Sequence, residues 1–459
     1  MSAAAPILGG MAPSPSIVWL RDDLRVSDNP ALRAAVDRGG EVVVVYVRDE
    51  VSPGIRPLGG ATRWWLHHSL AALDASLREL GAALTLRTGA AADVIPQLVE
   101  QTGAGAVFWN RRYGAAREID AGLKSSLRDA GLEVQSFQAN LLFEPWTVTT
   151  GDNNPYRVFT PFWKACLDRG VDREPLAAPE VIEGADVASE NLDDWNLLPT
   201  RPDWAGGLRE TWTPGEHGAH ERLDDFLDGV IADYHRRDEP AAIATSGLSP
   251  HLRFGEISPF QVWHAVRRHP GPNNAKFLSE VGWREFNWSI LYSFPELHTK
   301  NYRPAFDAFP WEQPDAADLA AWQRGRTGIP LVDAGMRELW HSGSMHNRVR
   351  MVVASFLIKN LLIDWRVGEA WFWDTLVDAD EASNPGNWQW VAGSGADAAP
   401  YFRVFNPILQ ADKFDKGGRY VHRWVSEVDT ADYPEPIVDL AQSRKDALSA
   451  YEVVKSASR

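Results

Sequence analysis

The first third of the chain alternates short apolar runs with amphipathic stretches of helical periodicity. The apolar runs occupy residues 17–20, 42–47, 83–86, 106–109 and 134–137, and residues 61–80 form the longest helical stretch between them. Parallel strands that are buried on both faces read as continuous apolar runs, and a helical crossover joins each strand to the next. The pattern therefore predicts a doubly wound parallel sheet, an α/β domain over residues 16–150.

The rest of the chain separates into a linker and a helical domain, so the expected fold class is α/β followed by all-α. Residues 151–215 are rich in acidic side chains and prolines, which predicts an interdomain linker. From residue 216 to 459 the periodicity is helical. The pair Ser258-Pro259 predicts the start of one helix, and Asp333 predicts the cap of another. Residues 349–362 are so continuously apolar that we expect them to be buried on most sides.

Composition narrows the class of protein without deciding its ligand. A chain of 459 residues is long enough for two or three domains that together bury a large cofactor. No apolar run is long enough to cross a bilayer, and residues 1–15 predict a disordered leader instead of a signal peptide. The single cysteine, Cys166, excludes an internal disulfide and fits a reducing compartment, so a cytoplasmic location is expected.

The net charge of −16 does not exclude a polyanionic ligand. Residues 171–240 hold 18 acidic and six basic side chains, so this stretch carries most of the negative charge. The remainder is nearly balanced and can present a basic face to phosphates.

A cluster of hydroxyl groups and a pair of carboxylates are candidate contacts for a phosphate-bearing ligand. Three hydroxyls and a glycine precede a helical pattern in the segment Thr245, Ser246, Gly247, Leu248 and Ser249. This segment suits a phosphate cradle of backbone N–H groups and hydroxyls, and it is equally typical of a capping loop before a helix. Asp378 and Asp380 lie two residues apart, which predicts a turn. There they either bind ribose hydroxyls and ring N–H groups or end a helix in solvent.

Charged and aromatic residues of the helical part are further candidates, each with a plainer alternative. Arg348 and Arg350 precede the apolar run, so at least one should lie near the interior and pair with a carboxylate such as Asp378. Glu280 and Trp283 are three residues apart and share a helix face that can grip a base by stacking and hydrogen bonding. Tryptophans at such spacing more often belong to a core.

Tryptophan is unusually dense towards the end of the helical part. Trp322, Trp365 and Trp388 sit where a chain of electron donors can be built, and Trp390 supplies another large ring. His346 in the same region is more typical of a satisfied structural histidine than of a proton donor. No metal-ligand or nucleophile motif competes with this arrangement, so we expect a redox site that needs no metal.

These residues stand within an ordered set of motifs that closely resembles the photolyase/cryptochrome flavoproteins and, within them, a class I cyclobutane pyrimidine dimer photolyase. The motifs are WLRDDLR at 19–25, VFTPF at 158–162, LRFGE at 252–256, WREF at 283–286 and FNP at 405–407. They span nearly the whole chain apart from the leader and the linker. The resemblance implies an N-terminal α/β antenna domain and a C-terminal helical domain that binds FAD and DNA.

The resemblance also assigns cofactor contacts and an electron relay. The residues expected to hold FAD are Tyr234, Thr245, Ser246, Gly247, Leu248, Ser249, Arg350, Asp378, Asp380 and Asn384. Asn384 matches the residue that faces flavin N5, where photolyases have Asn, plant cryptochromes Asp and insect-type cryptochromes Cys. Trp388, Trp365 and Trp322 match the relay that rereduces oxidised flavin by passing a hole to the surface.

The activity implied is light-driven repair of cyclobutane pyrimidine dimers, in which excited reduced FAD lends an electron to a flipped-out dimer. The implied catalytic residues are Glu280, Asn347, Met351 and Asn384. The implied DNA-binding residues are Arg237, Glu280, Trp283, Arg284, Asn347, Arg348, Trp390 and Arg403. The alternatives are a cryptochrome-like blue-light receptor without repair and a (6-4) photolyase. The segment 345–351 argues against the (6-4) photolyase, because it has a methionine where the (6-4) enzymes have an acid.

The resemblance extends to a second chromophore and to partners. Residues 60–77 resemble deazaflavin-binding relatives, and Arg117 stands where folate-binding relatives have Glu. The expected antenna is therefore 8-hydroxy-5-deazaflavin, with methenyltetrahydrofolate, FMN or no antenna as alternatives. UV-damaged DNA is the expected partner of a bacterial-type, nucleoid-associated monomer that needs neither a membrane nor an obligate protein partner.

Overall fold

The computed structural model describes residues 13–398 and 402–457, so residues 1–12 of the predicted leader lie outside the described part. The described residues form two compact units, each of which is discontinuous in sequence. The first unit comprises those within Met1–Arg56, Leu70–Asn140 and Pro175–Trp195, and the second those within Pro57–Ser69, Leu141–Glu174 and Asn196–Arg459. A division into consecutive ranges, as predicted from composition, does not describe this interleaving.

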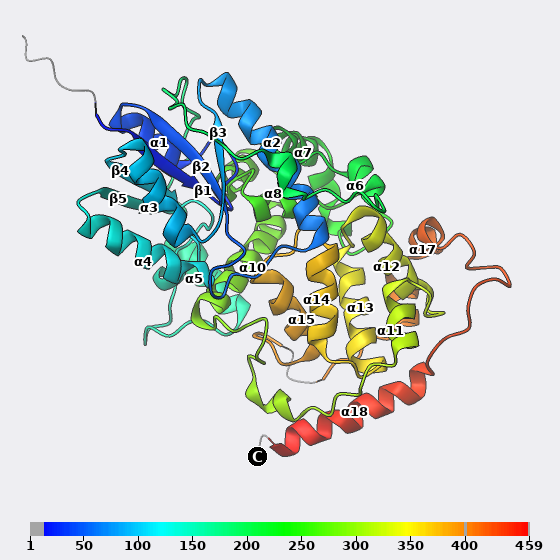
Figure 1. Ribbon diagram of the computed structural model, residues 1–459. Coiled ribbons are helices and arrows are strands. Elements are labelled where there is room, and N and C mark those ends of the chain that lie inside the picture. Colours follow the sequence, from blue (N-terminus) through cyan, green and yellow to red (C-terminus); the bar gives the residue numbers. More distant parts are fainter. Residues whose placement is uncertain (1–12, 399–401, 458–459) are drawn as a thin grey trace, which may run out of the picture. The chain divides into compact units, whose positions relative to one another are not determined.

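The first unit is built around a parallel sheet of five strands (Figure 1). The strands are β1 (Ser16–Leu20), β2 (Val42–Arg48), β3 (Leu84–Thr88), β4 (Ala106–Asn110) and β5 (Glu133–Phe137). Their order is β3-β2-β1-β4-β5, and Val18 at the centre is aligned with Val44 on one side and Phe108 on the other. All five predicted apolar runs are strands, and the predicted doubly wound parallel sheet is confirmed.

Four helices connect these strands: α1 (Pro30–Arg38), α2 (Gly60–Glu79), α3 (Ala91–Thr102) and α4 (Ala116–Asp129). The helix α1 begins where the Asn29 side chain accepts a hydrogen bond from Leu32 N, with Pro30 at the first helical position. It packs against β1, β4 and β5, whereas α3 and α4 share a core with Trp19, Val45 and Trp109.

A buried polar network lies at the carboxyl ends of β1 and β4, where the strand order changes direction. Arg21 pairs with Asp120 at 3.1 Å between Nη2 and Oδ2. The Asn110 amide donates to Asp23 Oδ2 at 2.7 Å and to Asn29 Oδ1 at 2.8 Å. Burial lowers the pKa of Arg21 to about 10 and raises the pKa of Asp23. Ligands of open α/β sheets often bind at such a switch point, but here the chain's own side chains occupy it.

The range 151–215, predicted as one linker, is divided between the two units. It contains the helix α5 (Phe159–Arg169), the 3₁₀ turn η2 (Leu192–Trp195) and the helix α6 (Gly206–Thr211). In α5, Phe162 and Cys166 are buried in a core cluster of the second unit. Residues 175–195 run beside β2 and β3 instead, where Val42 N donates to Glu183 O at 2.7 Å. The prolines and acidic residues therefore indicated that much of this range is exposed, but they did not show which unit each part packs against.

The second unit is helical, as predicted. Besides α5 and α6, its helices before residue 300 are η1 (Pro145–Thr147), α7 (Glu216–Asp228), η3 (Val230–Arg236), α8 (Ser249–Phe254), α9 (Pro259–Arg268) and α10 (Asn274–Ser293). The later ones are η4 (Pro304–Ala308), α11 (Ala316–Gln323), α12 (Pro330–Ser342), α13 (Asn347–Ser355), the π-helix η5 (Phe356–Asn360), α14 (Trp365–Thr375), α15 (Ser383–Ala392), α16 (Pro407–Phe414), α17 (Arg419–Trp424) and α18 (Leu440–Ala457). The yellow and orange helices α12 to α15 lie side by side in Figure 1, and α13 contacts α12 and α15.

Two of the three local predictions for this unit are confirmed and one is wrong. Ser258 caps α9 in a capping box with Gln261, and the apolar stretch beginning at Val349 is buried over most of α13 and η5. Asp333 is not a helix cap, because it lies within the first turn of α12. Its carboxylate instead accepts hydrogen bonds from Thr327 N at 2.7 Å and Gly328 N at 3.1 Å, which fixes the preceding loop. Within the described residues, no helix combines the length and the apolar character that crossing a membrane requires.

Candidate functional site

The hydroxyl-rich segment 245–249 leads directly into α8. Its cap residue is Leu248, and no side chain caps the helix, so the hydroxyls do not serve the capping role that was the plainer alternative. Thr245 and Ser249 are exposed, and Gly247 has a φ of +65°, a backbone conformation that favours glycine. Ser249 Oγ donates to Asp378 Oδ2 at 2.7 Å, which ties the segment to the loop between α14 and α15.

Asp378 is also the partner of Arg350, as predicted. The two guanidinium nitrogens donate to the two carboxylate oxygens at 3.1 and 3.0 Å, and Arg350 Nε donates to Met345 O at 2.7 Å. Such a bidentate pair fixes both side chains in one plane. Ser249, Arg350 and Asp378 therefore form one polar cluster, although they lie far apart in sequence.

Asp380 and Asn384 lie at the start of α15, and the predicted turn is present before this helix. Asp380 Oδ1 accepts from Ala382 N at 2.8 Å and from Ser383 N, so this carboxylate organises the first turn. Asn384 is buried, and its Nδ2 donates to Glu369 Oε1 at 2.8 Å and to Glu369 O at 3.1 Å. Because both amide hydrogens face Glu369, the amide oxygen is turned away from it. No hydrogen bond to that oxygen is found among the described residues.

The structure brings Tyr234, Arg237 and Glu280 together. Glu280 on α10 pairs with Lys276 at 2.8 Å and with Arg237 at 3.6 Å, and the Arg237 guanidinium lies 5.7 Å from the Tyr234 ring centroid. Tyr234 is buried against Phe277, and burial raises the pKa of its phenol. Glu280 keeps a third of its side-chain surface exposed, so one side of this carboxylate is open to a ligand.

Trp283 and Arg284 follow on α10 but point to different environments. Trp283 stacks on Phe159 with centroids 3.9 Å apart and planes 9° apart, and it remains half-buried. Arg284 turns to Glu285 at 3.1 Å, and burial raises the pKa of Glu285 to about 7. Trp283 thus keeps part of its ring accessible for stacking, whereas Arg284 forms an ion pair with a buried carboxyl group.

The residues from His346 to Met351 begin α13. His346 Nδ1 accepts from Arg348 N at 3.2 Å, and burial lowers the pKa of His346 to about 4, so the ring is neutral near pH 7. Its other ring nitrogen, Nε2, is buried without a hydrogen-bond partner among the described residues, so the prediction of a satisfied structural histidine is not confirmed. Asn347 is exposed, Arg348 pairs with Asp238 at 2.9 Å, and Met351 lies 3.9 Å from the Arg348 guanidinium.

Trp390 and Arg403 belong to two segments that follow one another in sequence. Trp390 Nε1 donates to Asp397 O at 3.2 Å, and the ring is half-buried. Arg403 is exposed, with its guanidinium 5.7 Å from the Phe405 ring centroid.

The predicted tryptophan relay differs from the structure at Trp322, the residue expected to lie at the surface. Trp388 contacts Trp322 at 6.4 Å between ring centroids, and Trp365 Nε1 donates to Asn301 Oδ1 at 3.0 Å. Trp322 is fully buried, and its indole N–H donates to Val353 O at 3.3 Å. It therefore cannot carry a hole to the surface, and the prediction that it ends the relay there is wrong.

Sequence reasoning missed Trp311, which is half-buried. It packs against the same core, and Glu312 N donates to Leu362 O at 2.9 Å, which places this segment beside the residues that lead into Trp365. The signal in the sequence was a tryptophan within a proline-interrupted stretch between helices, a place where rings seldom reach full burial.

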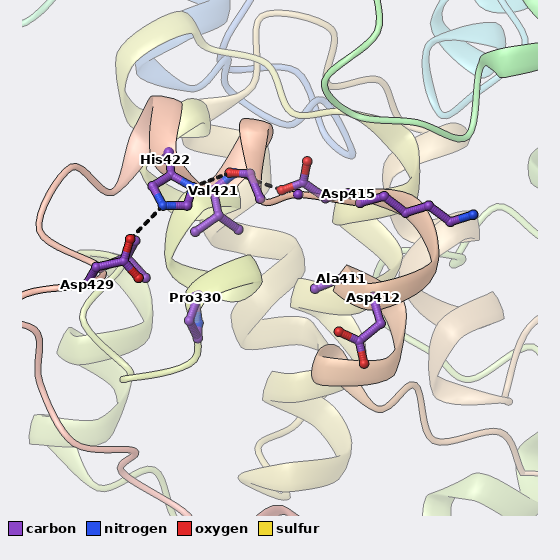
Figure 2. A pocket seen from close by; sticks show the side chains of 11 residues that line it. Pro330, Ala411, Asp412, Asp415, Val421, His422 and Asp429 are labelled. Carbon is purple, nitrogen blue, oxygen red and sulfur yellow. Dashed lines mark hydrogen bonds and ion pairs between the residues drawn. The ribbon is translucent and has the colours of Figure 1, made fainter.

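A separate pocket of about 410 Å³ lies beside α16 and α17 (Figure 2). Its lining includes Asp412, Asp415 and His422, and none of the predicted site residues. In Figure 2, His422 points to Asp429, to which its Nε2 is bonded at 2.8 Å. This pocket is thus distinct from the clusters described above.

The fold agrees with comparisons to known proteins. The model of the FAD binding domain of DNA photolyase matches residues 277–432, and the DNA photolyase model matches residues 16–180. The chain belongs to the photolyase/cryptochrome family, which confirms the expected family. Among individual relatives, it is 52% identical to the deoxyribodipyrimidine photo-lyase of Agrobacterium fabrum, over 96% of this chain and 98% of the relative.

Two further comparisons place the chain within that family. The crystal structure of a bacterial class III photolyase from Agrobacterium tumefaciens superimposes with a TM-score of 0.93 at 50% identity, over 98% of this chain and all of the other. Cryptochrome-1 of Arabidopsis thaliana is 40% identical over 90% of this chain and 63% of its own length.

Proposed function

We propose that this protein is a deoxyribodipyrimidine photo-lyase, which repairs cyclobutane pyrimidine dimers in DNA under light. The observation that carries the proposal is the buried Asn384 amide, held in one orientation by Glu369 within a chain whose similarity to photolyases extends over its whole length. A neutral amide with its oxygen open can accept a hydrogen bond from a ring N–H group, and it has no acidic proton to give.

The residues present fit FAD. Ser249, exposed next to the left-handed Gly247, and the Asp378–Arg350 pair supply the hydroxyl, backbone and charged groups that a diphosphate and a ribose require. Trp388 Nε1 is buried without an acceptor among the described residues, which is costly unless a ligand completes the site. FAD in its reduced form, when bound, supplies an electron on excitation and takes it back after the dimer has split.

The protein's own residues then receive the damaged bases. An extruded dimer loses its stacking partners, and a half-buried ring such as Trp283 or Trp390 replaces part of that stacking. Glu280, held by Lys276 and Arg237, accepts hydrogen bonds from thymine N–H groups. The exposed Asn347 and the neighbouring Met351 line the same side of α13.

Cations around these residues bind the phosphates. We assign this role to Arg237, Arg348 and Arg403. Arg284 instead pairs with Glu285, which holds α10 by accepting a hydrogen bond from Phe143 N at 3.2 Å. Phosphate contacts position the duplex without reading its sequence, so affinity should fall steeply as the salt concentration rises.

We further propose that Trp388 and Trp365 carry a hole away from the oxidised cofactor and that Trp311 replaces Trp322 as its exit. Trp388 and Trp365 are buried, and only Trp311 among the three is partly exposed. This relay restores the reduced cofactor and takes no part in splitting the dimer.

The subclass, the antenna and the cellular setting are also proposals. The sequence motifs suggested class I, but 50% identity to a class III photolyase structure favours class III, and we propose that class. For the antenna we retain 8-hydroxy-5-deazaflavin on the sequence of residues 60–77 and on Arg117. A monomer in the bacterial cytoplasm, associated with the nucleoid through DNA, fits the single buried cysteine.

The proposed function is tested with purified, chemically reduced protein and an oligonucleotide that carries a single thymine dimer. Near-ultraviolet light should convert the dimer to two thymines, and a sample kept in the dark should not change. The competing function is a blue-light receptor, favoured by the 40% identity to a plant cryptochrome. Intact dimers after illumination of protein with a full complement of reduced flavin would favour the receptor.

A further inference from the structure

Lys359 is a buried lysine in the π-helix η5. Its side chain is 1% exposed, and the ammonium donates a hydrogen bond to the backbone carbonyl of Arg403. The same nitrogen lies 4.2 Å from the ring centroid of Phe402. Among the described residues, no carboxylate pairs with it. Burial, and secondly the charge of Arg403, lower the pKa of Lys359 to about 7.

Packing alone does not account for this arrangement. Burying an ammonium group is expensive unless a carboxylate compensates for it, and an apolar side chain of similar length fills the same space at a lower cost. The π-helical turn is also uncommon and is frequently found at functional sites. We therefore look for the role of Lys359 in the segment whose backbone it contacts, at Arg403.

That segment, residues 402–406, is attached to the second unit at several points. Phe402 stacks on Tyr451 of α18 with centroids 4.6 Å apart, and Phe405 N donates to Ser355 Oγ at 3.1 Å. Asn406 caps α16. Lys359 makes the contact to the backbone of Arg403, the residue of this segment whose side chain is exposed. Loss of the ammonium would release the Arg403 peptide while the flanking contacts remain.

We infer that Lys359 is a positioning residue that fixes the backbone at Arg403 so that the exposed guanidinium meets a DNA phosphate. The inference rests on the proposed function, which assigns Arg403 to DNA. A cation held in place binds a phosphate more tightly than a mobile one, because less conformational freedom is lost on binding. The consequence concerns the affinity for DNA and its dependence on salt, and it leaves the chemistry of repair largely untouched.

The test is a double-mutant cycle with Lys359→Met, Arg403→Gln and the combined variant. We expect K359M to weaken binding of a dimer-containing duplex by a factor of about 3 to 10, and the slope of log K against log salt to fall by up to about 0.9, the value for one phosphate contact. The combined variant should bind no more weakly than R403Q. KM for the duplex should rise more than turnover at saturating DNA falls. Lys455→Met, which removes an exposed lysine charge from α18, is the control for net charge.

The outcomes separate this inference from the proposed function. If K359M weakens binding equally in the parent and in R403Q, or leaves both affinity and salt slope unchanged in a folded protein, the inference is overturned and the proposed function stands. If R403Q itself binds as the parent does, Arg403 has no role in DNA binding and the inference fails with it. Should K359M not fold, Lys359→Gln takes its place, because its amide keeps an N–H donor for the Arg403 carbonyl. If K359Q and R403Q weaken DNA binding additively, the inference is overturned as well.

Discussion

The two units use buried polar residues in opposite ways. In the first unit, Arg21, Asp23, Asn110 and Asp120 are almost fully buried and bond to one another at the switch point of the sheet. In the second unit, Glu280 and Arg350 each keep at least a quarter of their side-chain surface exposed, and Ser249 is exposed.

The difference separates residues that make the fold from residues that make a site. A buried network whose members bond to one another rigidifies a core, although Arg21 Nε and Asn110 Oδ1 have no hydrogen-bond partner among the described residues. A half-exposed cluster keeps donors and acceptors free on one side. Changes to the first kind should alter stability with little effect on function, and changes to the second kind should do the reverse.

The largest contrast is expected between tryptophans of the two units. Trp365→Phe should abolish photoreduction of oxidised flavin yet spare repair by chemically reduced protein, because the relay serves activation alone. Trp19→Phe, in the Trp19–Trp109 pair of the first unit, should leave both rates unchanged. Flavin absorbance under illumination measures the first rate, and dimer loss measures the second. If W365F lost both activities together, the relay role would be wrong.

The next contrast concerns the Asp378–Arg350 pair. Asp378→Ala should lower the affinity for FAD about 100-fold, because the bound cofactor would lose a hydrogen bond to a charged carboxylate, worth on the order of 3 kcal/mol. Flavin retained after dialysis is the measurement. Asp412→Ala removes an exposed carboxylate from α16 of the same unit and should retain flavin as the parent does. Equal retention in both variants would exclude Asp378 from the cofactor site.

Within the first unit, Asp120→Asn should act on stability alone. The variant keeps the shape of the side chain and loses the charge that pairs with Arg21 and Arg112, at a cost of about 2 kcal/mol. Because a protein with two units has no single unfolding free energy, hydrogen exchange of the β1 and β4 amides is the suitable measurement. A changed repair yield per bound flavin in folded D120N would show that this network belongs to the site after all.

A smaller effect is expected at Glu280. Glu280→Ala should lower the repair yield about 10-fold, the value of one hydrogen bond to a charged group, while flavin content stays close to that of the parent. Glu296→Ala, which removes an exposed carboxylate paired with Lys300, is the matched control. Recovery of E280A as apoprotein would point to a structural role for this carboxylate.

The smallest effect is expected at His422, beside the pocket of Figure 2. Its two nitrogens face Asp429 Oδ2 and Gly418 O, which only accept, so the doubly protonated cation alone makes both bonds and they raise the pKa of His422. Its stabilising contribution is complete below the ordinary pKa of 6.5 and is lost as the pH rises through the folded value. His422→Asn should therefore melt closer to the parent at about pH 8.5 than at about pH 5.5. Identical differences at both values would rule out the cation.

Much of the fold was predictable because it depends on local pattern. Each strand of the sheet was an apolar run, and Ser258 before Pro259 marked the start of α9. The interleaving of the units was not predictable, since it depends on which core accepts Phe162 and Cys166 of α5. Periodicity shows that a side chain is buried and does not show against what.

The sequence was a better guide to which residues belong to the candidate site than to how deeply they are buried or what they contact. The pairing of Arg350 with Asp378 followed from the cost of an unpaired buried charge. The confusion of Trp322 with Trp311 arose because sequence alone gives no depth of burial, and the structure places the first inside the core. Asp333 failed as a cap for a related reason, since an aspartate near a helix start bonds to whichever backbone N–H groups the preceding loop presents.

The most direct test of the account is the electron balance of repair. Fully reduced protein, without added reductant or oxygen, is illuminated with a molar excess of thymine-dimer oligonucleotide, and split dimers are counted against flavin that remains reduced. We predict many dimers split per flavin with the reduced absorbance unchanged, since the lent electron returns each time. A yield that stops at one dimer per flavin as the flavin becomes oxidised, or no splitting at all, would contradict the account.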